Sequence, residues 1–185
     1  MPKVSDEHLA ARRRQILEAA ARCFARDGFH RTSMQDIVRE SGISAGLVYR
    51  YFTGKDDMIT AIVTDWHEQR AARLAPDPAT AYLDLLRSVG DPAARDDARL
   101  GVQVWAEALR SPEILALVKA GVDGPRAAAA GALGGDDALA RVLIAIYQGL
   151  VLQTAWDEPV DHEAFARAVE SLVARAGEGP GPARG

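Results

Sequence analysis

The chain has 185 residues, of which 48% are hydrophobic and 26% charged, and its formal net charge is −4 at pH 7. These values are typical of a globular protein that is long enough to bury a core. The single cysteine, Cys23, excludes an internal disulfide and suits a reducing compartment. No apolar run reaches the roughly 18 residues of a membrane span, and no signal-peptide segment is recognisable, so we expect a cytoplasmic protein without a membrane partner.

Positive charge is concentrated near the N-terminus. Residues 1–55 contain 10 Lys/Arg and 6 Asp/Glu, whereas residues 56–185 contain 12 and 20. The first segment therefore carries a net charge of +4 and the remainder −8. This asymmetry indicates a part that faces nucleic acid, attached to an acidic remainder.

A first helix is predicted from the polar start at residues 5–7 to Gly28. Ser5 is a candidate cap, and the acids that follow it favour the positive end of a helix dipole. Apolar residues then repeat on one helical face, which comprises Ile16, Leu17, Ala20, Cys23 and Phe24. We expect the cysteine to be part of the core rather than a nucleophile.

Residues 32–55 predict two short helices around a tight turn. Ser33 is a candidate N-cap, and Asp36 three residues later completes a pattern like a capping box. Gly42 breaks the first helix where a positive φ lets the chain turn, and Ser44 is placed to cap the second helix. Such a pair is a helix-turn-helix unit, whose second helix enters the major groove of DNA.

Further helical patterns follow, and no strand pattern is present, so the predicted fold class is all-α. A fourth helix begins near Gly54 and ends by Ala75, because the next prolines cannot continue it. Later helices are predicted around 82–89 and 100–109, from 114 onwards, and over 136–156 and 161–175. The helix that begins near 114 is expected to break at Gly121 and at Gly124-Pro125.

The Pro-Asp-Pro segment at 76–78 is the expected domain boundary. Residues 1–55 then form a DNA-binding domain, and a helix over about 55–75 connects it to the next. Residues 76–176 form a C-terminal helical domain, and residues 177–185 form a disordered tail.

The residues of the two short helices share a pattern with a known family. The matching positions are Thr32, Ser33, Ile37, Gly42, Ser44, Gly46, Tyr49, Tyr51, Phe52 and Lys55. This pattern, with the helix before it, resembles the TetR family of bacterial transcriptional repressors over about residues 10–60. Val38, Ser41 and Ile43 depart from the family pattern without removing a group expected to touch DNA. The resemblance implies a dimeric repressor that binds a palindromic operator in double-stranded DNA and is released by a small-molecule effector.

The expected DNA contacts lie at the start of the second short helix and just after it. Ala45 and Gly46 let the backbone approach the groove closely, and Arg50 can pair with a guanine edge or with a phosphate. The other expected contacts are the phosphate clamps Tyr49, Tyr51 and Lys55, and the hydroxyls and helix N-termini at Thr32, Ser33 and Ser44. For Tyr51, packing in the core of the small domain is an equal alternative, and Phe52 is expected to be core.

A dimer and an effector pocket are expected in the C-terminal domain. One helix-turn-helix makes few base contacts, so useful specificity requires two half-sites and hence a homodimer. The candidate interface residues, with monomer core as the alternative, are Leu139, Leu143, Ile146, Leu150 and Leu172. The pocket is implied by the family resemblance, and its candidate lining residues, with ordinary packing as the alternative, are Trp66, Gln103, Trp105, Tyr147, Gln148 and Trp156.

Other functions find little support in the sequence. The four histidines are scattered without metal-ligand spacing, and Asp161-His162-Glu163 is typical of the first turn of a helix. We therefore expect neither an enzyme nor a metal or other cofactor. A DNA-binding regulator without any effector is the main alternative. A helix-turn-helix domain used only for protein contacts is a further alternative, and activation of transcription instead of repression also stays open.

Overall fold

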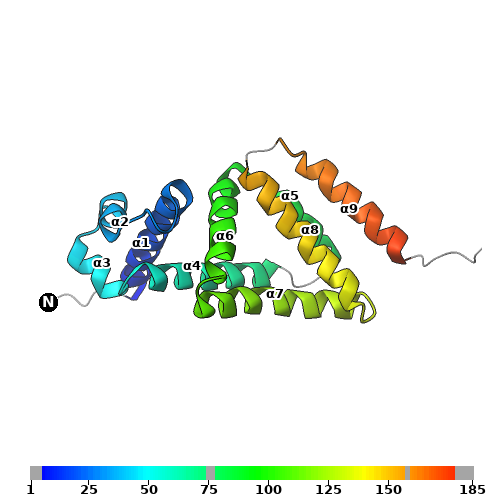
Figure 1. The fold of residues 1–185 in the computed structure, drawn as a ribbon, viewed down its shortest axis with the longest axis horizontal. Helices are drawn as coiled ribbons and strands as arrows, with labels where there is room; N and C mark the ends of the chain where they lie inside the picture. Colours follow the sequence, from blue (N-terminus) through cyan, green and yellow to red (C-terminus); the bar gives the residue numbers. More distant parts are fainter. Residues whose placement is uncertain (1–5, 74–77, 157–158, 178–185) are drawn as a thin grey trace, which may run out of the picture.

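The described part of the chain, residues 6–73, 78–156 and 159–177, forms nine α-helices and one short 3-10 helix in a computed structural model (Figure 1). No strand occurs among these residues, which agrees with the predicted all-α class. The predictions for Ser5, for the chain at 74–77 and for the tail from 178 fall outside the described residues. The helices are α1 (Asp6–Asp27), α2 (Met34–Ser41), α3 (Ala45–Tyr51), α4 (Lys55–Arg73), α5 (Pro78–Ser88), η1 (Pro92–Ala94), α6 (Arg95–Ala108), α7 (Pro112–Ala132), α8 (Asp137–Ala155) and α9 (His162–Gly177).

Helix α2 begins at its predicted cap, and α1 and α2 end at their predicted glycines. The Ser33 hydroxyl accepts a hydrogen bond from the Asp36 amide at 3.2 Å, and the Asp36 carboxylate accepts one from the Ser33 amide at 2.9 Å. Gly28 and Gly42 follow α1 and α2 with φ values of 87° and 66°, which glycine adopts without a Cβ clash. Ser44 occupies the N-cap position of α3, but its hydroxyl makes no capping hydrogen bond.

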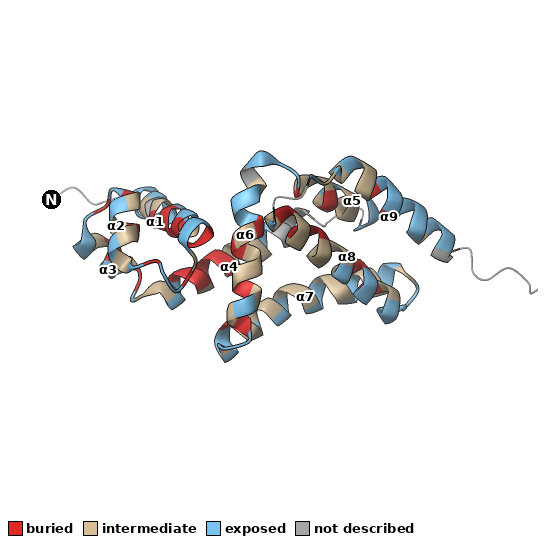
Figure 2. Ribbon diagram, turned by 45° about the horizontal axis from the view of Figure 1, so that its top comes forward, coloured by how far each residue is buried: buried red, intermediate tan, exposed pale blue. Residues whose placement is uncertain are grey.

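One apolar cluster, which we call the N-terminal core, joins α1–α4 to α6 and α7. Phe24, Ile37 and Met58 are all 0% exposed, and Val104 of α6 belongs to the same cluster. Cys23 is also fully buried, and burial raises the pKa of its thiol, as expected for an inert core cysteine. Buried segments accordingly run from α1 through α4 into the middle of the molecule (Figure 2).

A second apolar cluster, the C-terminal core, joins α5, α6, α8 and α9. Leu86 and Leu150 are 0% exposed within it. In Figure 1, α6, α7 and α8 outline a triangle, and α9 lies at the far end from α1–α3. His162 fastens the start of α9, because its ring contacts Thr154 Oγ1 at 3.0 Å and packs where a Cβ at Gly90 would lie, 2.6 Å from the ring.

The predicted break in the seventh helix is wrong, since α7 continues through Gly121, Gly124 and Pro125 to Ala132. Packing of α7 against α6 and α8 outweighs the lost hydrogen bond at proline, and the alanines that follow favour helix. Gly121 instead allows α7 to pack closely against α4, because a Cβ at this position would overlap the His67 ring. The helix stops before Gly134 and Gly135, which have positive φ values of 68° and 95°.

Among the described residues, one helix, α8, is long and apolar enough to cross a membrane by length and composition alone, with a mean hydropathy of 1.4. This is weak evidence, since the core helix of a soluble protein passes the same test. Only 28% of the most apolar 18-residue stretch of α8 is buried inside the protein. Part of the apolar surface of α8 is therefore exposed, including Val142.

Candidate functional site

Helix α3 presents one face outward and packs the other against the N-terminal core. Val48 is 0% exposed, whereas Tyr49 is 54% exposed and Ala45, Gly46 and Arg50 are exposed as well. Within the described part of the chain, Arg50 has no ion pair or side-chain hydrogen bond. Its guanidinium is therefore available to a base edge or a phosphate, as a recognition helix requires.

The end of α3 returns to the protein interior. Phe52 is 2% exposed and belongs to the N-terminal core, as predicted, and Arg13 lies over its ring at 5.6 Å. Tyr51 is partly buried and packs against the same core. The packing alternative therefore accounts for part of the Tyr51 side chain, and its contact with DNA stays a prediction.

Polar contacts tie α1 to α2, the helix that precedes α3. The Gln15 side-chain amide donates to the Ser41 carbonyl at 2.8 Å, at the end of α2. Arg22 and Arg26 both pair with Glu40, at 2.9 and 3.3 Å, and these hydrogen bonds lower the pKa of Glu40. Sequence reasoning missed these residues, because a polar side chain on a helix surface does not indicate its partner.

Two predicted DNA contacts have partners inside the protein. Thr32 is only 2% exposed, and its hydroxyl donates to the Gly28 carbonyl at 2.8 Å, so its predicted role as a DNA contact is corrected to that of a buried cap for α1. The Lys55 ammonium donates to the Phe29 carbonyl at 2.7 Å and lies 4.8 Å from the Phe29 ring centre. Lys55 therefore holds the turn after α1 against the start of α4, and a phosphate would share an ammonium that is already bonded.

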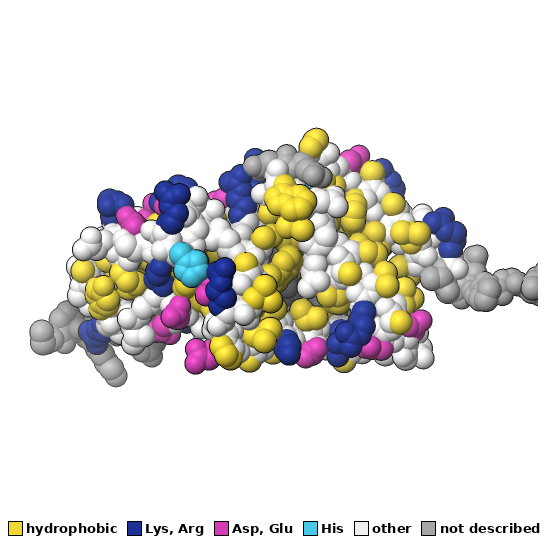
Figure 3. Space-filling model, in the orientation of Figure 1, with side chains coloured by type: hydrophobic (Ala, Val, Ile, Leu, Met, Phe, Trp, Pro, Cys, Tyr) yellow, Lys and Arg dark blue, Asp and Glu magenta, His cyan; other side chains and the backbone are white. Residues whose placement is uncertain are grey.

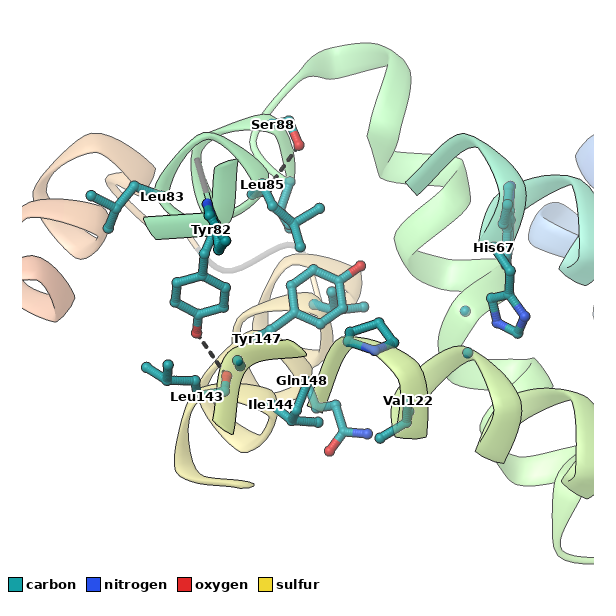
Figure 4. A pocket seen from close by; sticks show the side chains of 18 of the residues that line it. His67, Tyr82, Leu83, Leu85, Ser88, Val122, Leu143, Ile144, Tyr147 and Gln148 are labelled. Atoms are coloured by element: carbon teal, nitrogen blue, oxygen red, sulfur yellow. Dashed lines mark hydrogen bonds between the residues drawn. The ribbon is translucent and has the colours of Figure 1, made fainter. Parts of the chain in front are cut away.

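The C-terminal helices enclose a cavity of about 660 Å³. It extends between α4, α5, α6, α7, α8 and α9, and four of the six predicted lining residues contribute to it: Trp66, Trp105, Tyr147 and Gln148. Figure 4 shows Tyr147 and His67 reaching toward the cavity from α8 and α4, and Tyr82 donating from its hydroxyl to the Leu143 carbonyl at 2.7 Å. Burial of this hydroxyl raises the pKa of Tyr82.

The other two predicted pocket residues lie elsewhere. Trp156 follows the last turn of α8 and is 64% exposed, so its prediction as a pocket residue is corrected. Gln103 faces the opposite side of α6 and accepts a hydrogen bond from the Phe29 amide at 3.0 Å. Beside it, Glu107 Oε2 lies 3.0 Å from His30 Nε2. Helix α6 therefore contacts the turn after α1 on one face and the cavity on another.

One lining residue that sequence reasoning missed is Asp97. It lies two helical turns before Trp105 on α6, and this shared face was the available signal. Desolvation, followed by the neighbouring Asp96 carboxylate, raises the pKa of Asp97.

The predicted interface residues divide between core and surface. Leu150 is 0% exposed and Leu143 is 8% exposed, and both belong to the C-terminal core, so the monomer-core alternative is the correct one for them. Ile146 packs partly buried against the same core, and Leu139 is half-buried. Leu172 is 52% exposed, as an interface residue should be in a single chain. Figure 3 shows hydrophobic side chains gathered on one face of the C-terminal helices.

The acids and histidine at the start of α9 have structural partners. Asp161 accepts a hydrogen bond from the Ala164 amide at 2.9 Å, and Glu163 pairs with Arg87 at 2.8 Å. In the part of the chain that the structure describes, no group of three or more His, Cys, Asp or Glu residues could hold a metal ion.

Known proteins share the sequence of the N-terminal part. A family model described as bacterial regulatory proteins, tetR family, matches residues 16–62. An HTH-type transcriptional repressor from Mycobacterium tuberculosis is 43% identical over 72 residues, which make up 39% of this chain and 38% of that protein. The HTH-type transcriptional regulator UidR from Escherichia coli is 32% identical over 111 residues, 58% of this chain and 57% of UidR. The matches thus span from over a third to over half of the length of these two curated relatives.

Solved structures share the fold over nearly the whole chain. Salmonella enterica GusR has a TM-score of 0.71 at 25% identity and covers 96% of this chain and 100% of its own. A TetR-like transcriptional regulator from Rhodococcus sp. RHA1 has a TM-score of 0.73 at 22% identity, covering 97% and 100%. A transcriptional regulator from Saccharomonospora viridis, solved in complex with choline, has a TM-score of 0.73 at 24% identity, covering 89% and 96%. The likeness to these solved structures therefore includes the C-terminal helices as well as the N-terminal ones.

Proposed function

Because the chain belongs to the TetR family of helix-turn-helix transcriptional regulators, we propose that it is a repressor that binds a palindromic operator as a dimer and leaves it when a small molecule occupies the C-terminal cavity. The family is one of regulators, so no enzymatic activity is proposed. The observation that carries the proposal is the exposed face of α3. Tyr49 and Arg50 are exposed there, and Gly46 has no side chain that would keep the backbone away from DNA. This face suits phosphate contacts around a single long base-reading side chain.

The second copy required by a palindrome would cover α8. One face of α8 carries six exposed or partly exposed residues at intervals of four and three, the last of them the C-cap: Ala138, Val142, Ala145, Gly149, Leu152 and Trp156. We call these residues the α8 stripe. Val142 and Trp156 are 51% and 64% exposed, and the small residues between them allow two helices to approach closely. Covering the stripe with its own copy across a two-fold axis would remove this apolar surface from water.

Two helices would couple the cavity to α3. Helix α4 begins four residues after the end of α3 and carries Trp66 and His67 on the cavity wall. Helix α6 contributes Trp105 to the wall, and its Gln103 holds the Phe29 amide of the DNA-binding unit. A ligand that binds one arrangement of α4 and α6 better than another would change the angle and spacing of the two recognition helices in the dimer.

The volume of about 660 Å³ is that of a cavity that takes a drug-sized ligand. The Saccharomonospora viridis relative was solved with choline, which supports a small-molecule effector here. The main alternative, a regulator without an effector, leaves a cavity of this size unused.

The test measures binding of the full chain to DNA fragments from the region that flanks its gene. Fluorescence anisotropy gives the affinity at increasing salt concentrations. We expect a specific complex of two protomers that weakens as salt rises. Arg50→Ala should lower operator affinity by about 1–3 kcal/mol and relax base preference, whereas Arg167→Ala, an exposed arginine on α9, should change neither. A chain that forms no salt-sensitive specific complex would refute the proposal. A bound operator that no compound in a thermal-shift screen releases would favour the effector-free alternative.

A further inference from the structure

The cavity has a one-sided charge. Three carboxylates contribute to its lining, Asp91, Asp97 and Glu170, and no lysine or arginine does so among the described residues. We propose that the effector is an organic cation, an amine or quaternary ammonium that carries an apolar body. This inference rests on the proposed function, because it assigns a chemical class to the ligand of the same cavity.

Aromatic rings supply the second element of a cation site. Trp66, Trp105, Tyr82 and Tyr147 line the cavity from α4, α6, α5 and α8, so rings face it from four helices. The Tyr82 hydroxyl is bonded to the Leu143 carbonyl, which leaves its ring as the part that meets a ligand. Ring faces attract cations, and indole does so most strongly, whereas an anion gains nothing from them.

One face of α6 orders these groups along the cavity. Asp97, Gly101 and Trp105 follow at intervals of four residues, so they lie one above the other. The rise of the helix separates the first from the last by about 12 Å. Gly101 has no side chain between them, and a Cβ there would touch only Val151, at an ordinary 3.9 Å. The free space over Gly101 fits an apolar body between a charged end and an aromatic end.

Of the three lining carboxylates, Asp97 is the one that shares a helix with an aromatic lining residue, Trp105 on α6. It is exposed, and it lines the cavity on the same face of α6 as Gly101 and Trp105, so a cationic group can pair with it while the rest of the ligand lies along that face. We therefore place the positive charge of the ligand at Asp97 and its apolar body toward Trp105.

The test compares three probes of similar size by isothermal titration calorimetry on the full chain. The probes are benzyltrimethylammonium, its uncharged carbon isostere neopentylbenzene, and the anion 3-phenylpropanoate. The cation should bind with a dissociation constant about tenfold lower than that of the isostere, and the anion should bind more weakly than both. Equal or tighter binding of the isostere or the anion, or no binding of the cation at millimolar concentration, would overturn the assignment.

Two variants locate the charge. Asp97→Asn should weaken the cation about tenfold and leave the isostere unchanged. Asp96→Asn removes the same charge from the same turn of α6 but is not part of the cavity lining, so it controls for helix stability and net charge. Equal losses in both variants, or no loss in either, would contradict a site at Asp97.

Operator release separates this inference from the proposed function. If the anion or the isostere binds best and releases DNA, the regulator proposal stands and the cation assignment falls. If the cation binds as expected while the operator complex persists, the assignment stands and the proposed switch falls.

Discussion

The N-terminal and C-terminal cores use the same kinds of apolar residue but leave different amounts of space. In the N-terminal core, Phe24, Ile37 and Met58 are all completely buried. The C-terminal core has buried residues as well, yet its helices enclose about 660 Å³. A filled core holds a surface at one angle, whereas a hollow one has an internal surface that a ligand can occupy. This difference suits the proposed function, in which the N-terminal part holds α3 toward DNA and the C-terminal part binds the effector.

A matched pair of isoleucines tests this contrast most strongly. Ile37→Ala should cost about 2–5 kcal/mol of unfolding free energy, because the packed core cannot close around the space left. Ile144→Ala should cost only about 1 kcal/mol, because its side chain already borders the cavity. Urea denaturation followed by circular dichroism measures both values. Equal costs would show that the C-terminal core is packed as tightly as the first.

The surfaces of the two parts should differ as well, since the α8 stripe in the C-terminal part is expected to meet a second copy. Val142→Glu should split the dimer and lower operator affinity on the order of 100-fold, because one recognition helix reads only one half-site. Sedimentation velocity and anisotropy follow the two effects. Leu109→Glu puts the same charge on a residue that is 86% exposed and off the stripe, so it should leave both unchanged. A dimeric Val142→Glu protein would place the interface elsewhere.

Filling part of the hollow should make the C-terminal core behave more like the N-terminal one. Gly101→Ala adds a methyl group that meets only Val151, and alanine favours helix over glycine by about 1 kcal/mol. The variant should therefore melt at a higher temperature, while benzyltrimethylammonium binds it more weakly. A lower melting temperature would mean that α6 needs glycine for its own packing.

The N-terminal part should respond to acid through its capping box. Hydrogen bonds from the Ser33 hydroxyl and amide, with Arg39 nearby, lower the pKa of Asp36 to about 2 from an ordinary 3.8. A lowered folded-state pKa stabilises the protein above the unfolded value, so this contribution should be lost as pH falls from about 4 to 2. Asp36→Asn and Ser33→Ala should both reduce the change in melting temperature between those pH values. An unchanged profile in both variants would remove the capping box from the acid response.

Local signals predicted most of the fold. The caps at Ser33, Gly28 and Gly42 and the apolar periodicity of α1 and α8 act over a few residues, so the sequence alone indicated them. The continuity of α7 was not predictable in this way, because packing against α6 and α8 decides it.

The candidate site was harder to predict than the helices, since it depends on how they are arranged. Which face of α6 meets the cavity decides that Trp105 lines it and Gln103 does not. On α8, Leu143 and Leu150 look like Val142 in a list of apolar positions, yet only Val142 stays exposed. Thr32 matched the family pattern, but its burial follows from the turn after α1.

The hydrogen bond from the Phe29 amide to Gln103 sets a condition for protein engineering. A chimaera that replaces α1–α3 with those of another protein must supply a turn with a free amide at the equivalent of Phe29. Such a graft leaves the outward face of α3 free to vary, since Tyr49 and Arg50 on that face are exposed. The graft must also keep the apolar packing of α1 and α4 on α6 and α7, because the N-terminal core extends into both of these helices.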